Sequence, residues 1–155
     1  MPSYEMRPFA MPEAERVASW AKTPEETMDV SGAQTSFLTA DDVAAWTYEA
    51  DYCFTLRWDG DLVAYGEIVE DVVENDVEIQ HLLVAPDMRS VGVGKAMLSR
   101  LCAFLAGARP YEEVWLRIGR ENAPAAACAR AVGFEAVAGM SGPRYLWLKK
   151  RLTLK

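Results

Sequence analysis

Residues 81–96 of the chain read HLLVAPDMRSVGVGKA, and this segment is the most informative about the fold. The apolar run 82–85 is typical of a buried strand, and Pro86 ends it. Two glycines, Gly92 and Gly94, then open a segment with helical periodicity over 91–108. N–H groups at the start of such a helix have no partner inside it, and glycines let ligand oxygens approach them closely. The stretch therefore predicts a phosphate or pyrophosphate site where a strand meets a helix.

Two familiar phosphate-binding motifs do not fit this loop. A Walker loop requires Gly where Arg89 stands and Ser or Thr where Ala96 stands. A dinucleotide fingerprint requires a third Gly where Met97 stands, and its glycines follow the strand more closely. The sequence therefore favours neither an NTPase nor a dinucleotide-binding protein.

The segments on either side predict a mixed α/β layered fold. Thr39 is placed to cap a helix, and Asp59-Gly60-Asp61 is a hairpin signal. The expected order is β-α-α-β-β-β-α-β-α-β-β. Strands are expected over 4–10, 52–58, 62–73, 77–85, 113–118, 134–138 and 144–152, helices over 12–22, 39–50, 91–108 and 122–132, and a loop over 23–38.

The central stretch resembles the acetyl-CoA motif of the GNAT superfamily of N-acetyltransferases, R/Q-x-x-G-x-G/A. The motif stands here as Arg89-Ser90-Val91-Gly92-Val93-Gly94, after a strand ending Leu82-Leu83-Val84 and before an amphipathic helix. A second element of the superfamily, Asn122-x-x-Ala125 followed by Gly133-Phe134, comes at the usual distance. The resemblance implies one GNAT-like domain over 1–155. Its sheet would be mixed and mostly antiparallel, with a splayed parallel pair and helices on both faces.

The resemblance also implies which residues hold acetyl-CoA as co-substrate. Backbone amides of the motif would bind the pyrophosphate, and the strand before it would bind the pantetheine arm as if it were a further strand. The N–H of Val84 would polarise the thioester carbonyl. Asn122 would reach the cofactor or simply cap a helix, while Val91, Val93, Met97 and Leu101 are expected in the core. The implied cofactor residues are Leu82, Leu83, Val84, Arg89, Ser90, Val91, Gly92, Val93, Gly94, Lys95 and Asn122.

Acetyl transfer to an amine requires a neutral nitrogen, which at pH 7 costs a lysine-like amine about 4–5 kcal/mol. Alignment on Val84 brings Glu78 to the position where relatives often carry a glutamate base, with a solvent-exposed strand residue as the alternative. Strand parity puts Glu78 on one face with Leu82 and Val84 unless a bulge intervenes. The same parity puts His81 on the opposite face, which predicts a structural role. Glu67 and Glu70 on the preceding strand are further candidates.

The departing CoA thiolate also needs a proton. Many relatives carry a tyrosine seven residues after the Asn of the second element, where this chain has Ala129. Tyr145 or solvent would have to replace it, or the protein would bind acetyl-CoA and regulate a partner without turnover.

Composition limits the remaining functions. The net charge of −7 argues against a surface that coats nucleic acid. Three scattered cysteines and a single histidine give no metal-site spacing, and no apolar run is long enough to span a bilayer. We therefore expect a cytoplasmic acyltransferase with no metal, no nucleic-acid or membrane partner, and a homodimer as one option.

The sequence says less about the acceptor than about the acetyl donor. We expect the acceptor pocket near Trp20, the 23–38 loop, Trp46, Tyr48 and the 140–145 turn. The first hypothesis is a small-molecule primary amine, and the second is a protein N-terminus or lysine.

Acetyl-CoA should raise the melting temperature of the protein, because a ligand that binds only the folded state stabilises it. CoA should act nearly as strongly, whereas NAD and ATP should do little. Thermal unfolding with each ligand checks this expectation. Stabilisation by NAD but not by CoA would contradict the resemblance.

Overall fold

The computed structural model describes residues 3–21, 37–89, 91–108 and 111–152. Its strands form one seven-stranded sheet in the order β1-β2-β3-β4-β5-β7-β6. The strands are β1 (Tyr4–Pro8), β2 (Tyr52–Trp58), β3 (Asp61–Asp71), β4 (Asp76–Val84), β5 (Glu113–Gly119), β6 (Glu135–Ala136) and β7 (Tyr145–Arg151). Only β4 and β5 pair in parallel, and the other neighbours are antiparallel. The predicted mixed sheet is therefore confirmed.

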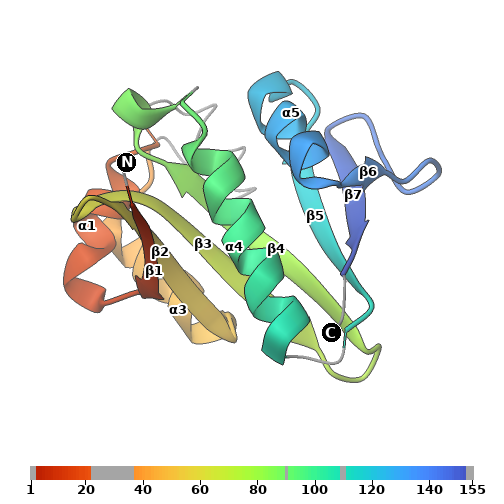
Figure 1. Ribbon diagram of the computed structural model, residues 1–155, viewed down its shortest axis with the longest axis horizontal. Helices are drawn as coiled ribbons and strands as arrows, with labels where there is room; N and C mark the ends of the chain where they lie inside the picture. The colour runs from red at the N-terminus through yellow and green to blue at the C-terminus, as the bar shows by residue number, and fades with distance from the viewer. Residues whose placement is uncertain (1–2, 22–36, 90, 109–110, 153–155) are drawn as a thin grey trace.

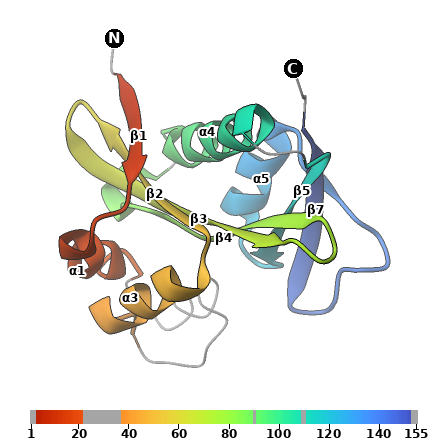
Figure 2. The ribbon, with the colours of Figure 1, turned by 90° about the horizontal axis from the view of Figure 1, so that it is seen from below.

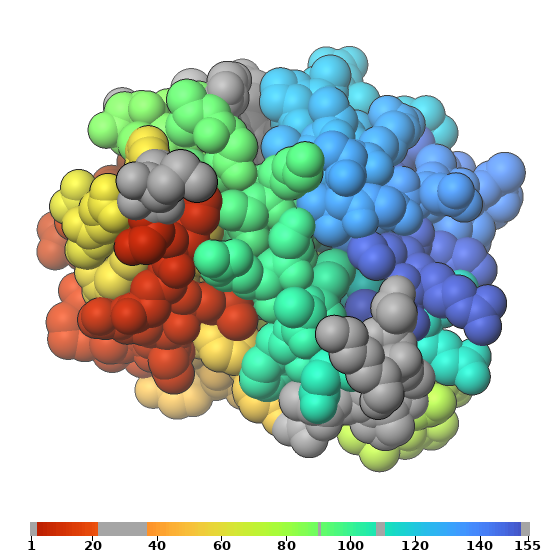
Figure 3. Space-filling model, in the orientation of Figure 1, coloured from red at the N-terminus to blue at the C-terminus, as the bar shows by residue number. Residues whose placement is uncertain are grey.

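Helices cover both faces of the sheet (Figures 1 and 2). The helices α1 (Ala14–Ala18) and α3 (Ala40–Glu49) pack on one face, where they enclose a core with β3 and the end of β4. The helices α4 (Val93–Ala108) and α5 (Ala123–Val132) pack on the other face over the larger core. We call these the α1/α3 face and the α4/α5 face. Figure 3 shows α4 on the surface between the N-terminal strands and α5.

Local chemistry explains where most elements begin and end. The Thr39 side chain accepts the N–H of Asp42 (3.2 Å), and the Asp42 side chain accepts the N–H of Thr39 (2.9 Å), which makes a capping box at the start of α3. Gly133 has φ 113°, and the N–H of Phe134 returns to the carbonyl of Ala129 (3.0 Å), which ends α5. Phe134 therefore belongs to the helix end rather than to the expected strand, which shrinks to β6.

Four expected boundaries are wrong for identifiable reasons. The expected helix 12–22 begins as a 3-10 turn, η1 (Met11–Glu13), and its α-helical part ends at Ala18. The helix expected from residue 91 begins at Val93, because Gly92 has φ 92° and cannot join it. Val91 is consequently 57% exposed and not in the core, whereas Val93, Met97 and Leu101 are buried as expected. Val72 and Val73 lie exposed in the β3–β4 turn rather than in the strand.

The described residues contain neither a membrane-spanning helix nor a metal-binding cluster. No helix there is long and apolar enough to cross a membrane. No group of three or more His, Cys, Asp or Glu side chains there is arranged to hold a metal ion. The three cysteines are free thiols, and burial raises the pKa of Cys102 to about 11. Most of the expected 23–38 loop lies outside the described residues.

Gly66 on β3 allows α4 to pack closely on the sheet. A Cβ at this position would lie 3.0 Å from Leu101 Cδ1 and 3.3 Å from Met97 Cε, which is overpacked. Gly66→Ala should therefore lower the free energy of unfolding by about 1–3 kcal/mol in urea titrations. Gly107→Ala on α4 is the control, since a Cβ there meets nothing within 4 Å. Equal stability of the two variants would show that α4 does not depend on this close contact.

Candidate functional site

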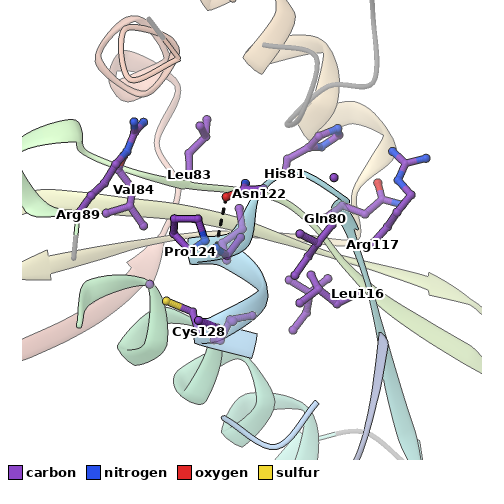
Figure 4. A pocket seen from close by; sticks show the side chains of 18 of the residues that line it. Gln80, His81, Leu83, Val84, Arg89, Leu116, Arg117, Asn122, Pro124 and Cys128 are labelled. Carbon is purple, nitrogen blue, oxygen red and sulfur yellow. Dashed lines mark hydrogen bonds between the residues drawn. The ribbon is translucent and has the colours of Figure 1, made fainter. Parts of the chain in front are cut away.

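The site is a cleft between the two parallel strands. β4 and β5 pair only at Glu78–Trp115 and Ile79–Leu116, and beyond this point they diverge toward the carboxyl end of β4. A cavity of about 650 Å³ fills the divergence. Figure 4 shows Gln80, His81 and Arg117 toward one end of the cavity and Val84 and Arg89 toward the other. The expected splayed parallel pair is present.

The cavity reaches both faces of the sheet. On the α4/α5 face it is lined by Gly94, Leu98 and Cys128, and on the α1/α3 face by Glu78, Gln80 and His81. An elongated ligand lying among the helices α4 and α5 could therefore meet a second ligand that arrives from the α1/α3 face. This arrangement suits a transfer between two substrates.

A β-bulge in β4 determines which side chains face each way. Gln80 pairs with Glu67 and Leu83 with Tyr65, so two residues of β4, His81 and Leu82, lie opposite one residue of β3. His81 takes φ 51°, which is uncommon for a residue with a side chain. The parity expected from the sequence is therefore wrong beyond this point. Glu78 does not share a face with Leu82 and Val84, and His81 lies on the face of Glu78.

The bulge leaves the end of β4 with backbone groups directed into the cleft. Ala85 donates its N–H to Val63 on β3 (2.9 Å), so the alternation of an antiparallel pair directs the N–H and C=O of Val84 the other way. The Nε of Arg89 donates to the Val84 carbonyl from that side (3.2 Å). The strand end is thus an open edge to which an extended ligand can add, as expected for the segment from Leu82 to Val84.

The start of α4 offers backbone donors beside this edge. Ala96 donates to the carbonyl of Gly92 (3.0 Å), so the N–H groups of Val93, Gly94 and Lys95 precede the first intrahelical bond. Arg89 holds the preceding loop in place, since it also donates to the carbonyl of Trp20 (2.8 Å). Ser90, the remaining motif residue, lies outside the described residues.

Asn122 caps a second helix at the same cavity. Its Oδ1 accepts the N–H of Ala125 at the start of α5 (3.3 Å), and the residue lines the cavity. Its role as a helix cap is confirmed, while its expected contact with the cofactor stays a prediction. Leu83 lines the cavity too, but its side chain is buried in the core of the α1/α3 face.

Glu78 has the environment of a proton acceptor. Its carboxylate accepts a hydrogen bond from Gln80 Nε2 (2.6 Å) and lines the cavity. Burial raises the pKa of Glu78 above its usual value, while the bond from Gln80 and the charge of Arg117 act in the opposite direction. Glu70, one of the two alternatives, accepts from Tyr111 Oη (2.6 Å) and is not among the described residues that line the cavity.

The second alternative, Glu67, belongs to a cluster that the sequence did not predict. Its side chain is 1% exposed, accepts a hydrogen bond from the Tyr65 hydroxyl and lies 2.8 Å from His81 Nδ1. Trp46 of α3 stacks on the His81 ring, with centroids 3.9 Å apart and planes at 6°. The single histidine was the only sign of this cluster in the sequence, because its partners come from two other elements.

The expected acceptor region is only partly at the cavity. Trp20 is buried in the core, Tyr48 is exposed, and Trp46 reaches the site through His81. Met140 shares a second hollow of about 310 Å³ with Glu78, Trp115 and Trp147. Ala129 is fully buried, so nothing at the usual tyrosine position can donate a proton. Tyr145 packs under the Arg117 guanidinium at 4.5 Å and is outside the described lining of the cavity.

A family model described as the acetyltransferase (GNAT) family matches residues 14–134, which include the cleft and both helix starts. The chain belongs to the GNAT acetyltransferase family. Among curated proteins, none matches the chain. The GNAT assignment makes the protein an acyltransferase by family.

Solved structures share the GNAT fold at low identity. The ribosomal-protein-S18-alanine N-acetyltransferase from Escherichia coli is 17% identical with a TM-score of 0.72, over 99% of this chain and 96% of that one. Spermidine N-acetyltransferase from Vibrio cholerae, in complex with CoA and spermine, is 12% identical with a TM-score of 0.77, over 96% and 95%. The yncA protein of Salmonella typhimurium, solved with its cofactor acetyl-CoA, is 14% identical with a TM-score of 0.75, over 97% and 94%.

A substitution at Gly94 distinguishes an effect on donor binding from an effect on folding better than one at Gly92, because any side chain at the φ of Gly92 is strained. A Cβ at Gly94 would make ordinary contacts with Cys128 Sγ (3.5 Å) and Val84 Cγ2 (3.6 Å). Gly94→Ala should therefore keep or raise the melting temperature, since alanine favours helix over glycine by roughly 0.5–1 kcal/mol. Its methyl group narrows the cavity, so we expect acetyl-CoA to bind roughly tenfold more weakly, about 1.4 kcal/mol, in calorimetry.

Gly107→Ala is the matched control within the same helix, and it should change stability without changing the affinity for acetyl-CoA. If Gly94→Ala bound acetyl-CoA as tightly as the wild type, the donor would have to bind elsewhere.

Proposed function

We propose that the protein is an acetyl-CoA-dependent N-acetyltransferase that acetylates a primary amine of a small molecule by direct attack on the thioester. The observation that carries this proposal is the cavity that passes between β4 and β5 and reaches both faces of the sheet. The backbone N–H groups at the start of α4 lie on one side of it and the Glu78 carboxylate on the other, as a two-substrate transfer requires.

The donor would bind mainly to the backbone. In our proposal the amides from Arg89 to Lys95 hold the pyrophosphate, helped by the positive end of the α4 dipole. The pantetheine arm extends along Leu82–Val84, and the Val84 N–H stabilises the charge that develops on the thioester oxygen. The outward direction of the Val84 backbone groups and the open space around Gly92 support this placement.

Glu78 would be the general base that removes the proton of the acceptor ammonium, directly or through a water. Its raised pKa supports this role, because a base works best when its pKa is closer to the working pH. The acidic residues of the second hollow, Asp71 and Asp76, would make the approach favourable for a cation.

Two other readings of the acceptor side remain. The alanine N-acetyltransferase among the similar structures is a reason to test protein N-termini, and peptide lysines belong to the same test. Buried Ala129 is the observation that favours an acetyl-CoA-binding regulatory module without turnover. Screening small amines and peptides for release of the CoA thiol distinguishes the three, since only the module releases none. A cytoplasmic location, a single domain over 1–155 and a homodimer stay predictions.

Glu78→Gln keeps the shape of the side chain and removes the base. With an active acceptor, kcat should fall by about 10²–10⁴ at neutral pH, while the affinity for acetyl-CoA stays nearly unchanged. The loss should shrink as the pH rises toward the pKa of the amine, because free amine then becomes abundant without help. Steady-state kinetics against pH measures this recovery.

Glu113→Gln is the control, since Glu113 is a half-exposed carboxylate on β5 that pairs with Lys149 (3.1 Å) away from the cavity. A raised KM with normal kcat would mean that Glu78 only binds the ammonium group. Normal kcat and KM in Glu78→Gln would remove it from the mechanism.

A further inference from the structure

The cluster around His81 is organised as a positioned imidazole. Both oxygens of buried Glu67 are used, one by the Tyr65 hydroxyl and the other by His81 Nδ1 (2.8 Å). Burial and the neighbouring Glu67 raise the pKa of Tyr65 well above its usual value, so its hydroxyl stays a donor. Trp46 stacks on the ring, the His81 side chain is 16% exposed, and His81 lines the cavity.

These contacts fix the proton on the ring. With Glu67 ionised, its carboxylate only accepts hydrogen bonds, so Nδ1 donates to it and carries the hydrogen. In the neutral ring the other nitrogen, Nε2, is then a bare proton acceptor. The contacts with Glu67 and Trp46 use Nδ1 and one face of the ring, and His81 lines the cavity.

The bulge is what brings this imidazole to the site. A regular strand would direct residue 81 to the face opposite Gln80, among the buried residues under α4. The left-handed backbone at φ 51° is unfavourable for a side-chain-bearing residue, and it persists where the surroundings hold it. Here the surroundings are Glu67 on β3 and Trp46 on α3.

The reaction of the proposed function lacks one proton carrier. An ammonium acceptor loses two protons when it becomes an amide, and Glu78 accounts for the first. The second must reach the sulfur of CoA, and the position where relatives keep a tyrosine is buried Ala129. His81 is a proton carrier at the cavity that the mechanism has not used.

We propose that His81, positioned by Glu67, carries the second proton from the attacking nitrogen to the CoA sulfur. The amine lone pair forms the C–N bond, and the π pair of the carbonyl moves to its oxygen. Nε2 then takes a proton from the nitrogen. The oxygen pair then returns to re-form the carbonyl as the C–S bond breaks. The electron pair of that bond goes to sulfur, which receives the proton from Nε2, so neutral His81 is restored. This step rests on the proposed function.

Several charged or titratable groups face the ring or line the same cavity. Glu67 faces it from β3, Glu78 lies on its own strand, and Arg117 lines the same cavity from β5. Cys53 on β2 interacts with Tyr65 and Glu67. Burial raises the pKa of its thiol to about 11, so the thiol stays neutral. Trp46 from α3 is uncharged.

The first test needs no acceptor. His81 is the only histidine of the chain, so the ¹⁵N shifts of the two ring nitrogens in untagged, labelled protein belong to it without assignment. We expect Nδ1 to be protonated and Nε2 bare in the neutral ring. Glu67→Gln should change the pH at which the signals titrate. The opposite tautomer, or a ring that Glu67→Gln leaves unaffected, would overturn the proposal.

The second test is His81→Asn with an acceptor that the wild type uses. Asparagine tolerates a left-handed φ, and its amide can still donate to Glu67, but nothing replaces Nε2. The variant should keep its melting temperature and its stabilisation by acetyl-CoA, while kcat falls by about 10²-fold or more. In the wild type, the pH at which kcat falls should match the NMR titration in the acetyl-CoA complex, and Glu67→Gln should move both together.

The outcomes separate the two proposals. An active wild type with an equally active His81→Asn would overturn this step and leave the proposed function intact. A wild type that binds acetyl-CoA but acetylates no amine or peptide would overturn the proposed function, and this step with it. A kinetic midpoint that stays fixed while the NMR midpoint moves in Glu67→Gln would assign the proton transfer to another group.

Discussion

The site depends on one irregular pairing, the bulge by which His81 and Leu82 of β4 oppose a single residue of β3. Before the bulge, Glu78 and Gln80 face the side covered by α1 and α3. After it, Val84 lies against Gly94 at the start of α4. A strand with unbroken alternation would put all three of these side chains on one face of the sheet and none of them on the other. Because the bulge lies where β4 diverges from β5, β4 contributes side chains to the parts of the cavity on both faces of the sheet.

The two sides of the cavity offer different chemical groups. On the α4 side, the available groups are backbone donors at a helix start and at an open strand edge, and these need few particular side chains beyond the glycines. On the α1/α3 side, the groups are side chains from several elements, among them Glu78, His81 and Arg117. This difference explains how the fold persists at 12–17% identity with the compared structures. Two of these proteins are a ribosomal-protein alanine N-acetyltransferase and a spermidine N-acetyltransferase, so the fold leaves the acceptor open.

Close packing and buried polar contacts hold the irregular strand in place. Gly66 lies opposite the bulge, and the absence of a side chain there lets Leu101 and Met97 of α4 reach the sheet. On the other face, Tyr65 and His81 satisfy the buried carboxylate of Glu67, which would otherwise be costly in the core. The Arg89 side chain ties the loop before α4 to Val84 and to Trp20. The same contacts that stabilise the bulge therefore also shape the cavity.

The order of the elements, the glycines at the start of α4 and the family were predictable from the amino-acid sequence. These features depend on local signals: the capping box of Thr39, the αL glycines and the alternation within each strand. The directions in which the side chains of β4 face depend on its pairing with β3, and the sequence did not predict them. A bulge exists only relative to a partner strand, so β4 alone could not reveal it, and it reversed the expected faces of Glu78 and His81. The cluster of Tyr65, Glu67, His81 and Trp46 comes from β3, β4 and α3, and the chain brings these residues together only after the sheet has formed and α3 has packed on it.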